Sequence, residues 1–328
     1  MIGLSSCNGI RMKASPIIKR FVILGCMFKR LSLLFIIALA FTNPIAAAEP
    51  EVVKLAEGVY GFIGKEGATN SGFVVTNEGI VVIDTQGPKE LALLLKKKIH
   101  EITDKPVVYV INTHFHGDHT FGNQYFKPVP EISNQGKARE IISHENTNRN
   151  LIEKDKQHRE QFKKFFGENS LEGFELTLPT KTIKDTLSLR VGNKTMEIAY
   201  LGRGHTDGDI IVYLPIERVL FGGDLLYNNR LPWLGDAYTG DWIETLNKLK
   251  HFDAGVYVPG HGDIGNIAML QDLQHYLTDL RAEVKKYMEK GKALDDMKRE
   301  ISLPKYKNHI KYKEWLPINA ERVYKELR

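Results

Sequence analysis

Cysteine is nearly absent from this chain of 328 residues, and the position of the few cysteines matters. The two that exist, Cys7 and Cys26, both lie within the first 48 residues. Without that segment, the chain has no disulfide, no thiol nucleophile and no thiolate ligand for a metal. Any metal site in the rest of the protein must therefore be built from imidazole nitrogens and carboxylate oxygens.

Acidic residues are absent from the first 48 residues, although the chain as a whole is rich in charge. That segment holds six basic residues, so the rest of the chain has 39 basic and 40 acidic residues, a net charge of −1. The formal charge of +5 for the whole chain therefore does not indicate a basic surface. We expect no nucleic-acid partner, because such a partner favours a surface enriched in lysine and arginine.

The first 48 residues also lack an apolar run long enough for a comfortable membrane span. The apolar run at 31–41 follows the basic pair Lys29-Arg30, and Ala46-Ala47-Ala48 fits the small-residue pattern of a cleavage site. We predict that residues 1–48 are an export signal region, and Met27 is an alternative start, because the signal is complete from there. The mature protein would be periplasmic or secreted, with no stable membrane span after cleavage.

Residues 49–328 alternate between strand-like and helical patterning, and no change of composition divides them. The stretches "VVKLAEGVYGFIG" and "SGFVVTNEGIVVIDT" each read as a hairpin, because turn residues separate two apolar runs. Segments with helical spacing then alternate with short apolar runs that suit buried strands. We predict a single α/β domain with an exposed helical insert at 137–168 and a helical tail at 293–328.

Four short motifs place metal-binding residue types at the ends of these strand-like runs. The first, "THFHGDH", follows "VVYVIN", and the others are "GHT", "GGD" and "PGHG". Because strand ends form the clefts of open α/β sheets, we expect these motifs to converge in the fold. The candidate ligands are His114, His116, Asp118, His119, His205, Asp224 and His261.

The number of candidate ligands is sufficient for two ions. One set would be His114, His116 and His205, a second would be Asp118, His119 and His261, and the two oxygens of Asp224 could bridge them. Imidazole and carboxylate ligands suit two zinc ions, with iron or manganese as alternatives. Two neighbouring ions can share one hydroxide and stabilise both the attacking and the leaving oxygen of a displacement.

The ordered set of "THFHGDH", "GHT", "GGD" and "PGHG", preceded by "VVIDT", resembles the metallo-β-lactamase superfamily over residues 51 to about 290. The resemblance implies a four-layer αβ/βα sandwich with a dinuclear site at the sheet edges. It also implies that each ligand set holds one metal and that Asp224 bridges the two. Asp84, in "VVIDT", matches an aspartate that supports the metal-binding loop from behind the ligands.

One motif departs from the best-known antibiotic-hydrolysing branch of that superfamily. Those enzymes carry cysteine where this chain has Asp224, and three residues later a lysine that holds the substrate carboxylate, where this chain has Tyr227. An aspartate is the pattern of the broader superfamily, which includes thioesterases of the glyoxalase II type and lactonases. Tyr227, Arg230 and Trp233 are candidates for substrate contact, with Arg230 as a replacement for the missing cation.

These observations lead us to expect an exported zinc-dependent hydrolase that acts on a small ester or cyclic amide, as a β-lactamase does. A metal-bound hydroxide would attack the substrate carbonyl, and Asp118 would orient the nucleophile and relay its proton. A thioesterase of glyoxalase II type or a lactonase on the same site remains an alternative. So does a non-catalytic metal-binding accessory protein. The expected partner is a small-molecule substrate, and the sequence indicates no particular oligomeric state.

Overall fold

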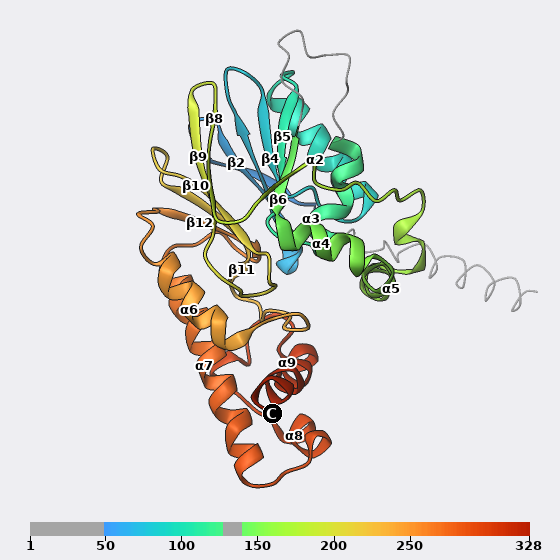
Figure 1. Cartoon of the computed structure of the whole chain (residues 1–328), viewed down its shortest axis with the longest axis vertical. Coiled ribbons are helices and arrows are strands. Elements are labelled where there is room, and N and C mark those ends of the chain that lie inside the picture. The colour runs from blue at the N-terminus through green and yellow to red at the C-terminus, as the bar shows by residue number, and fades with distance from the viewer. Residues whose placement is uncertain (1–48, 127–139) are drawn as a thin grey trace, which may run out of the picture. The chain divides into compact units, whose positions relative to one another are not determined.

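The fold is built on two β-sheets, shown by a computed structural model that describes residues 49–126 and 140–328 (Figure 1). One sheet has seven strands in the order β1 to β7, and the other has five strands in the order β12-β11-β10-β9-β8. The predicted export signal region, residues 1–48, lies outside the described residues, as do the first three residues of the predicted insert.

The first sheet combines antiparallel and parallel pairing. Its strands are β1 (Glu51–Ala56), β2 (Val59–Ile63), β3 (Ser71–Val75), β4 (Ile80–Ile83), β5 (Val107–Ile111), β6 (Glu140–His144) and β7 (Lys181–Ile183). The first four pair antiparallel, which confirms the two predicted hairpins, and β4 to β7 pair parallel. A parallel pair needs a crossover connection, and α2 (Lys89–Ile102) supplies it between β4 and β5.

The second sheet repeats this order of pairing. Its strands are β8 (Thr186–Val191), β9 (Lys194–Tyr200), β10 (Ile210–Leu214), β11 (Val219–Tyr227) and β12 (Val256–His261). Strands β8 to β11 pair antiparallel, and β11 pairs parallel with β12 through the crossover helix α6 (Thr239–Leu249). In each sheet, the parallel strands therefore end at one edge, and functional loops commonly follow such strand ends.

Apolar clusters hold the layers together. The central cluster joins side chains of both sheets, among them Val81 and Ile111 from the first and Ile198 and Val212 from the second. A second cluster packs α2 on the outer face of the first sheet, and a third packs helices on the outer face of the second sheet. Each large apolar side chain that is fully buried contributes about 1.5–3 kcal/mol. The order helix, sheet, sheet, helix is the predicted four-layer αβ/βα sandwich.

The beginning of the predicted helical insert is a strand. Residues 140–144 form β6, whose Ile141 and Ile142 are buried and pair in parallel with β5. A strand buried on both faces shows no alternation of polar and apolar residues, so its pattern resembles that of a buried helix. The helices of this region are α4 (Glu145–Glu153) and α5 (Asp155–Phe166), followed by the short η4 (Glu168–Leu171).

Helices make up the C-terminal part of the chain. They are α7 (Ala268–Glu289), α8 (Leu294–Glu300), the short η5 (Pro304–Tyr306) and α9 (Tyr312–Leu327). Among residues 49–126 and 140–328, no helix combines the length and the apolar character that crossing a bilayer requires.

Candidate metal centre

The seven candidate ligands come from four separate segments of the chain and meet beside the ends of β5, β11 and β12. His114 and His116 follow β5, and Asp118 and His119 lie in the short helix α3 (Gly117–Thr120). The other three are His205 in the turn between β9 and β10, Asp224 within β11, and His261 at the end of β12. Together they form two groups of side chains, each of which could hold a metal ion.

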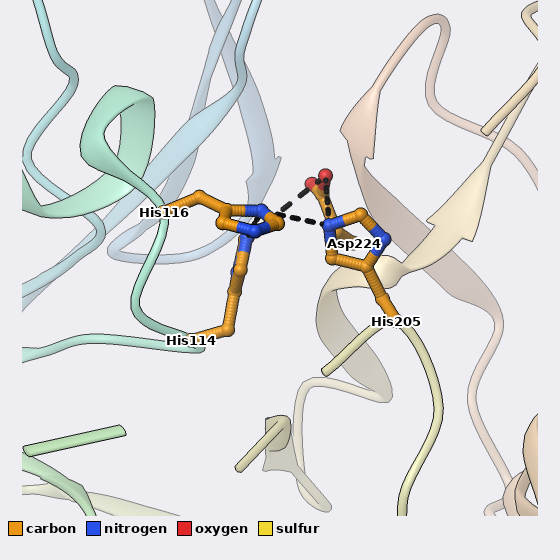
Figure 2. Close-up of side chains that lie close together, drawn as sticks. All are labelled: His114, His116, His205 and Asp224. Atoms are coloured by element: carbon orange, nitrogen blue, oxygen red, sulfur yellow. Dashed lines mark hydrogen bonds and ion pairs between the residues drawn. The ribbon is translucent and has the colours of Figure 1, made fainter. Parts of the chain in front are cut away.

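The first group consists of His114, His116, His205 and Asp224, whose rings and carboxylate face one another (Figure 2). Nδ1 of His116 lies 3.1 Å from Nε2 of His114 and 2.9 Å from Nε2 of His205. Oδ2 of Asp224 lies 3.3 Å from Nε2 of His205. Unprotonated imidazole nitrogens that point at one another repel, so their convergence fits a cation held between them.

The second group consists of Asp118, His119 and His261. Oδ2 of Asp118 lies 3.3 Å from Nε2 of His261 and 3.6 Å from Nε2 of His119. Asp224 faces this group as well, because its Oδ1 is 3.0 Å from Nε2 of His119. Nε2 of His119 and Oδ1 of Asp224 are buried and make no hydrogen bond within the described part of the protein. These atoms fit the role of metal ligands.

Asp84 supports the second group through contacts with Thr113 and His119. Its carboxylate accepts hydrogen bonds from the main-chain N–H of Thr113 (2.8 Å) and from the Thr113 hydroxyl (2.7 Å). Its Oδ2 also lies 2.8 Å from Nδ1 of His119, which leaves Nε2 of that ring to face the centre. Asp84 has a φ of 56°, a left-handed conformation that costs a non-glycine residue about 1–3 kcal/mol. This conformation occurs directly after the end of β4, where the carboxylate contacts Thr113 and His119.

Asp236 supports the first group, and the sequence patterns did not indicate it. Its Oδ2 lies 3.0 Å from Nε2 of His116, which directs Nδ1 of that ring toward the centre. Its other oxygen lies 3.3 Å from Nζ of Lys154, and the lysine lies over the ring of Phe115 at 4.7 Å. The aspartate and the histidine are 120 residues apart in the chain, so no local motif could reveal the contact.

Two glycines leave room for the side chains of Asp224 and Thr113. Gly223 has a φ of 50°, and a Cβ there would lie 2.4 Å from the hydroxyl oxygen of Thr113. A Cβ at Gly260, on the paired strand β12, would lie 1.9 Å from Oδ1 of Asp224. A side chain at Gly260 would displace the carboxylate of Asp224, and one at Gly223 would displace Thr113, which binds Asp84. The structure thus requires glycine at one position of "GGD" and at one position of "PGHG".

Tyr227 and Arg230, both predicted substrate contacts, have partners inside the protein. The hydroxyl of Tyr227 donates a hydrogen bond to Oδ2 of Asp224, and its ring stacks on His261 at 5.4 Å. Arg230 donates a hydrogen bond to the carbonyl oxygen of Gly67, which also lies 3.1 Å from Nδ1 of His261. Both side chains therefore support a ligand.

Trp233, the third predicted substrate contact, lies at the more open side of the centre. Its ring centroid is 5.3 Å from that of His116 and 6.5 Å from that of His205. The exposed Phe165 of α5 lies edge-on to it at 6.4 Å. Trp233 and Phe165 form an apolar wall beside the first group.

The ligands differ in exposure. His114, His119 and His205 have no exposed surface, whereas the side chains of His116 and Asp118 are 12% and 20% exposed. A structural metal site is closed on all sides, and a catalytic site keeps a position open for water or substrate. The openness at His116 and Asp118 is that of a catalytic site.

Burial keeps two histidines of the first group neutral. It lowers the pKa of His205 to about 3, and burial together with the charge of His119 lowers the pKa of His114 well below its usual value. Both rings therefore carry a free lone pair at neutral pH, which is the form that binds a metal.

The carboxylates of the centre are ionised. Burial by itself would raise the pKa of Asp118 and Asp224, but the charges of His119 and His261 outweigh it and hold both pKa values well below the usual range. In return, the carboxylates raise the pKa of His119 and His261 despite burial. The carboxylates and the imidazoles of this group thus favour each other's charged form.

Six further histidines lie outside both groups: His100, His144, His158, His251, His275 and His309. His158 is nevertheless buried, stacks on the ring of Phe115 at 4.5 Å, and has no hydrogen-bond partner for either ring nitrogen. Burial lowers its pKa to about 3.

Comparison with known proteins agrees with this geometry. The family model of the metallo-beta-lactamase superfamily matches residues 64–261, a range that contains all seven candidate ligands. The chain belongs to this superfamily. The metallo-beta-lactamase type 2 of Elizabethkingia meningoseptica is 28% identical over 282 residues, which cover 81% of this chain and 99% of the relative. That of Bacillus cereus is 27% identical over 216 residues, which cover 64% and 73%.

A solved structure of the superfamily has the same fold. The metallo-beta-lactamase from Pontibacter korlensis aligns with a TM-score of 0.56 and 25% identity, covering 70% of this chain and 99% of its own. The α/β sandwich, the superfamily and the cluster of histidines and aspartates together identify a metal-dependent hydrolase.

Proposed function

We propose that the protein is an exported hydrolase that holds two zinc ions and cleaves a carbonyl bond of a small ester or cyclic amide. The observation that carries the proposal is the position of Asp224. Its two oxygens lie 3.0 Å from His119 of one group and 3.3 Å from His205 of the other. A carboxylate between two sets of imidazoles suits a pair of ions that share one ligand.

The ligands would divide between the two ions. His114, His116 and His205 would hold the first, and Asp118, His119 and His261 the second, with Asp224 between them. Bound zinc would supply a water of lowered pKa and a Lewis acid for the carbonyl oxygen.

Asp118 would act on the attacking water. Its side chain is the most exposed of the seven, and its Oδ2 already accepts a hydrogen bond from the hydroxyl of Thr69 at 2.7 Å. The low pKa of Asp118 keeps it ionised, so it can orient the water by accepting a hydrogen bond. Because bound zinc would lower the pKa of that water, its proton could then pass to Asp118. We therefore assign Asp118 both a ligand role and a proton-transfer role.

The surroundings of the site favour substrates with an apolar group beside the first metal. Trp233 and Phe165 would contact that group, because pockets for small molecules are lined largely by aromatic and apolar side chains. Lys154 is a cation near His116, but it is already paired with Asp236. We accordingly place neutral esters and lactones ahead of carboxylate-bearing lactams.

The test is a substrate panel on purified mature protein, with zinc content measured in the same sample. The panel contains an aryl ester, a lactone, a thioester, a chromogenic β-lactam and a phosphodiester. We expect two zinc ions per chain and turnover of the ester or lactone. In D118N, kcat should fall by about 100-fold or more, because proton transfer typically contributes that much. The exposed Asp104 supplies the control, and D104N should match the wild type.

The panel also separates the alternatives. Preferred turnover of the thioester would favour an enzyme of glyoxalase II type. Two bound zinc ions without turnover of any member would favour a metal-binding accessory protein. Full activity in D118N would remove the role proposed for that carboxylate.

Export is tested separately. The basic pair at 29–30, the apolar run at 31–41 and the alanines at 46–48 are the observations that support it. N-terminal sequencing of protein expressed in full length in a Gram-negative host should find a periplasmic chain that begins at Glu49. A cytoplasmic chain with an intact N-terminus would overturn the export proposal and leave the hydrolase proposal unaffected.

A further inference from the structure

The C-terminal helix α9 lies outside the residues that match the family model, yet it binds a segment that contacts the metal centre. Its apolar side chains, including Leu316, Ala320 and Val323, belong to the cluster that also contains side chains of α7, and the two helices lie together at the C-terminal end of the chain (Figure 1). Asn319, Arg322 and Glu326 follow one another at helical spacing. All three bind the segment 232–240, which lies between β11 and α6 and includes the first two residues of α6.

Asn319 binds the beginning of this segment. It is fully buried, and its Oδ1 accepts a hydrogen bond from the main-chain N–H of Leu234 at 3.1 Å. Its Nδ2 donates to the carbonyl oxygen of Pro232 at 2.8 Å and lies 2.8 Å from the hydroxyl of Tyr276 on α7. One side chain thus fixes the main chain on both sides of Trp233.

Arg322 and Glu326 bind the rest of the segment. Nε and Nη2 of Arg322 donate to the carbonyl oxygen of Ala237 at 2.8 and 2.6 Å. The carboxylate of Glu326 accepts from the main-chain N–H groups of Thr239 and Gly240, both at 3.0 Å. These contacts go to main-chain atoms, so they set the path of the segment whatever its side chains are.

The segment in turn contacts His116 and the turn that carries His205, both members of the first metal-binding group. The carboxylate of Asp236, next to Ala237, lies 3.0 Å from His116. The main-chain N–H of Tyr238 donates to the carbonyl oxygen of Gly204 at 2.8 Å, immediately before His205. Helix α9 therefore binds Ala237, and the residues on either side of Ala237 contact His116 and the turn of His205.

We propose that Arg322 and Asn319 are positioning residues of the metal centre, which hold the segment 232–240 so that Asp236 orients His116. The inference rests on the proposed function, since it assigns the effect to the metal bound by His114, His116 and His205. It gives the C-terminal helix a part in metal binding as well as in packing.

The experiment is a zinc titration against a chromophoric chelator, which resolves two binding constants without any turnover. In R322A we expect one of the two binding constants to weaken by about tenfold and the other to stay unchanged. Tenfold is the lower end of the loss of affinity seen when a residue that supports a metal ligand is removed. The matched control is K325A, which removes a cation from the same helix at a side chain that is 61% exposed. It should leave both constants as in the wild type.

A second readout uses the metal-free protein. Amide hydrogen exchange of residues 232–240 should be faster in R322A than in K325A, because local opening follows the loss of the hydrogen bonds that hold the segment. R322K keeps one donor for the carbonyl oxygen of Ala237, so it should restore part of the metal affinity. If R322A does not fold, R322K remains testable and should lie between the wild type and D236N.

A double-mutant cycle shows whether the effect passes through Asp236. In D236N the addition of R322A should cause little further loss of affinity, because both changes remove the same support of His116. Equal weakening of both zinc sites in R322A, a full additional loss in the double variant, or an effect as large in K325A would overturn the inference. A wild-type protein that fails to bind two zinc ions would instead overturn the proposed function.

Discussion

Tyr227 donates its hydroxyl hydrogen to Oδ2 of Asp224, three residues earlier in β11. In a regular strand, side chains three residues apart point to opposite faces of the sheet. The pairing of β11 with β12 is irregular between Phe221 and Tyr227, and Gly223 has a positive φ. This irregularity brings the two side chains together, so that Tyr227 supports the shared carboxylate.

Y227F tests that support. The change keeps the ring that stacks on His261 but removes the donor to Asp224, so the carboxylate loses the group that fixes its orientation. We expect kcat/KM to fall by about tenfold or more, with zinc still bound. Tyr213 provides the control, because its hydroxyl donates to the carbonyl oxygen of Asp253 at 2.9 Å, away from the ligands. Y213F should retain wild-type kinetics, and an equal loss in both variants would argue against a specific role.

Trp233 is expected to determine how tightly the substrate binds. W233A removes the ring beside His116 and His205 and leaves the main-chain contacts of the segment in place. For an ester with an apolar substituent, KM should rise severalfold while kcat changes less, since the lost contact is made in the ground state as well as the transition state. For the smallest ester of the series, the difference should shrink. A uniform fall in kcat across the series would place Trp233 in the chemistry instead.

Removal of metal should destabilise the protein. Each ion that binds only the folded chain stabilises it by about 4 kcal/mol when its free concentration is a thousandfold above Kd. A chelator should therefore lower Tm by several degrees, and added zinc should restore both Tm and activity. D224N provides the comparison, because it removes the charge that faces both groups. Its Tm should respond far less to zinc; an identical response would exclude Asp224 as a shared ligand.

His158 should make the metal-free protein sensitive to acid. Its pKa is about 3 in the folded protein, because of burial, and about 6.5 in an unfolded chain. Between these values the unfolded state binds one proton more than the folded state. The stability that the neutral ring allows is therefore present above pH 6.5 and is lost as the pH falls toward 3, by about 1.4 kcal/mol per pH unit.

H158F removes this proton while keeping an aromatic ring against Phe115. Urea unfolding at pH 7.5, 6 and 5 should show a shallower loss of stability in H158F than in the wild type. His251 is exposed, so H251F should keep the wild-type slope. Identical slopes for H158F and the wild type would mean that folding does not lower the pKa of His158.

Much of the fold was accessible from the sequence. The two N-terminal hairpins, helix α2 and the strands that precede the ligand motifs follow from local periodicity and turn residues. Strand β6 was read as part of an exposed helical insert, because Ile141 and Ile142 lie on a strand buried on both faces and give no alternation. Strand β10 is buried throughout as well, but its run of five apolar residues is long enough to indicate a strand, whereas β6 has only the pair Ile141-Ile142.

The sequence by itself determined the chemistry of the centre. With no cysteine beyond residue 48, the candidate ligands are imidazoles and carboxylates, and the four motifs put histidine and aspartate at strand ends, where a metal site can form. The supporting role of Asp84 was also accessible from the sequence, because the resemblance to the superfamily assigns that role to an aspartate at this position.

Only the tertiary structure decided what surrounds those ligands. Asp236 lies 120 residues from His116 in the chain, and Asn319 lies 85 residues from the Leu234 amide that it binds. Single carboxylates, amides and tyrosines of this kind occur throughout any sequence, and nothing in their neighbours distinguishes the ones that support a ligand. Their roles depend on strand irregularity and helix packing, which arise from contacts between distant segments. The ligands are set by residue type and spacing, and their orientation is set by the folded chain.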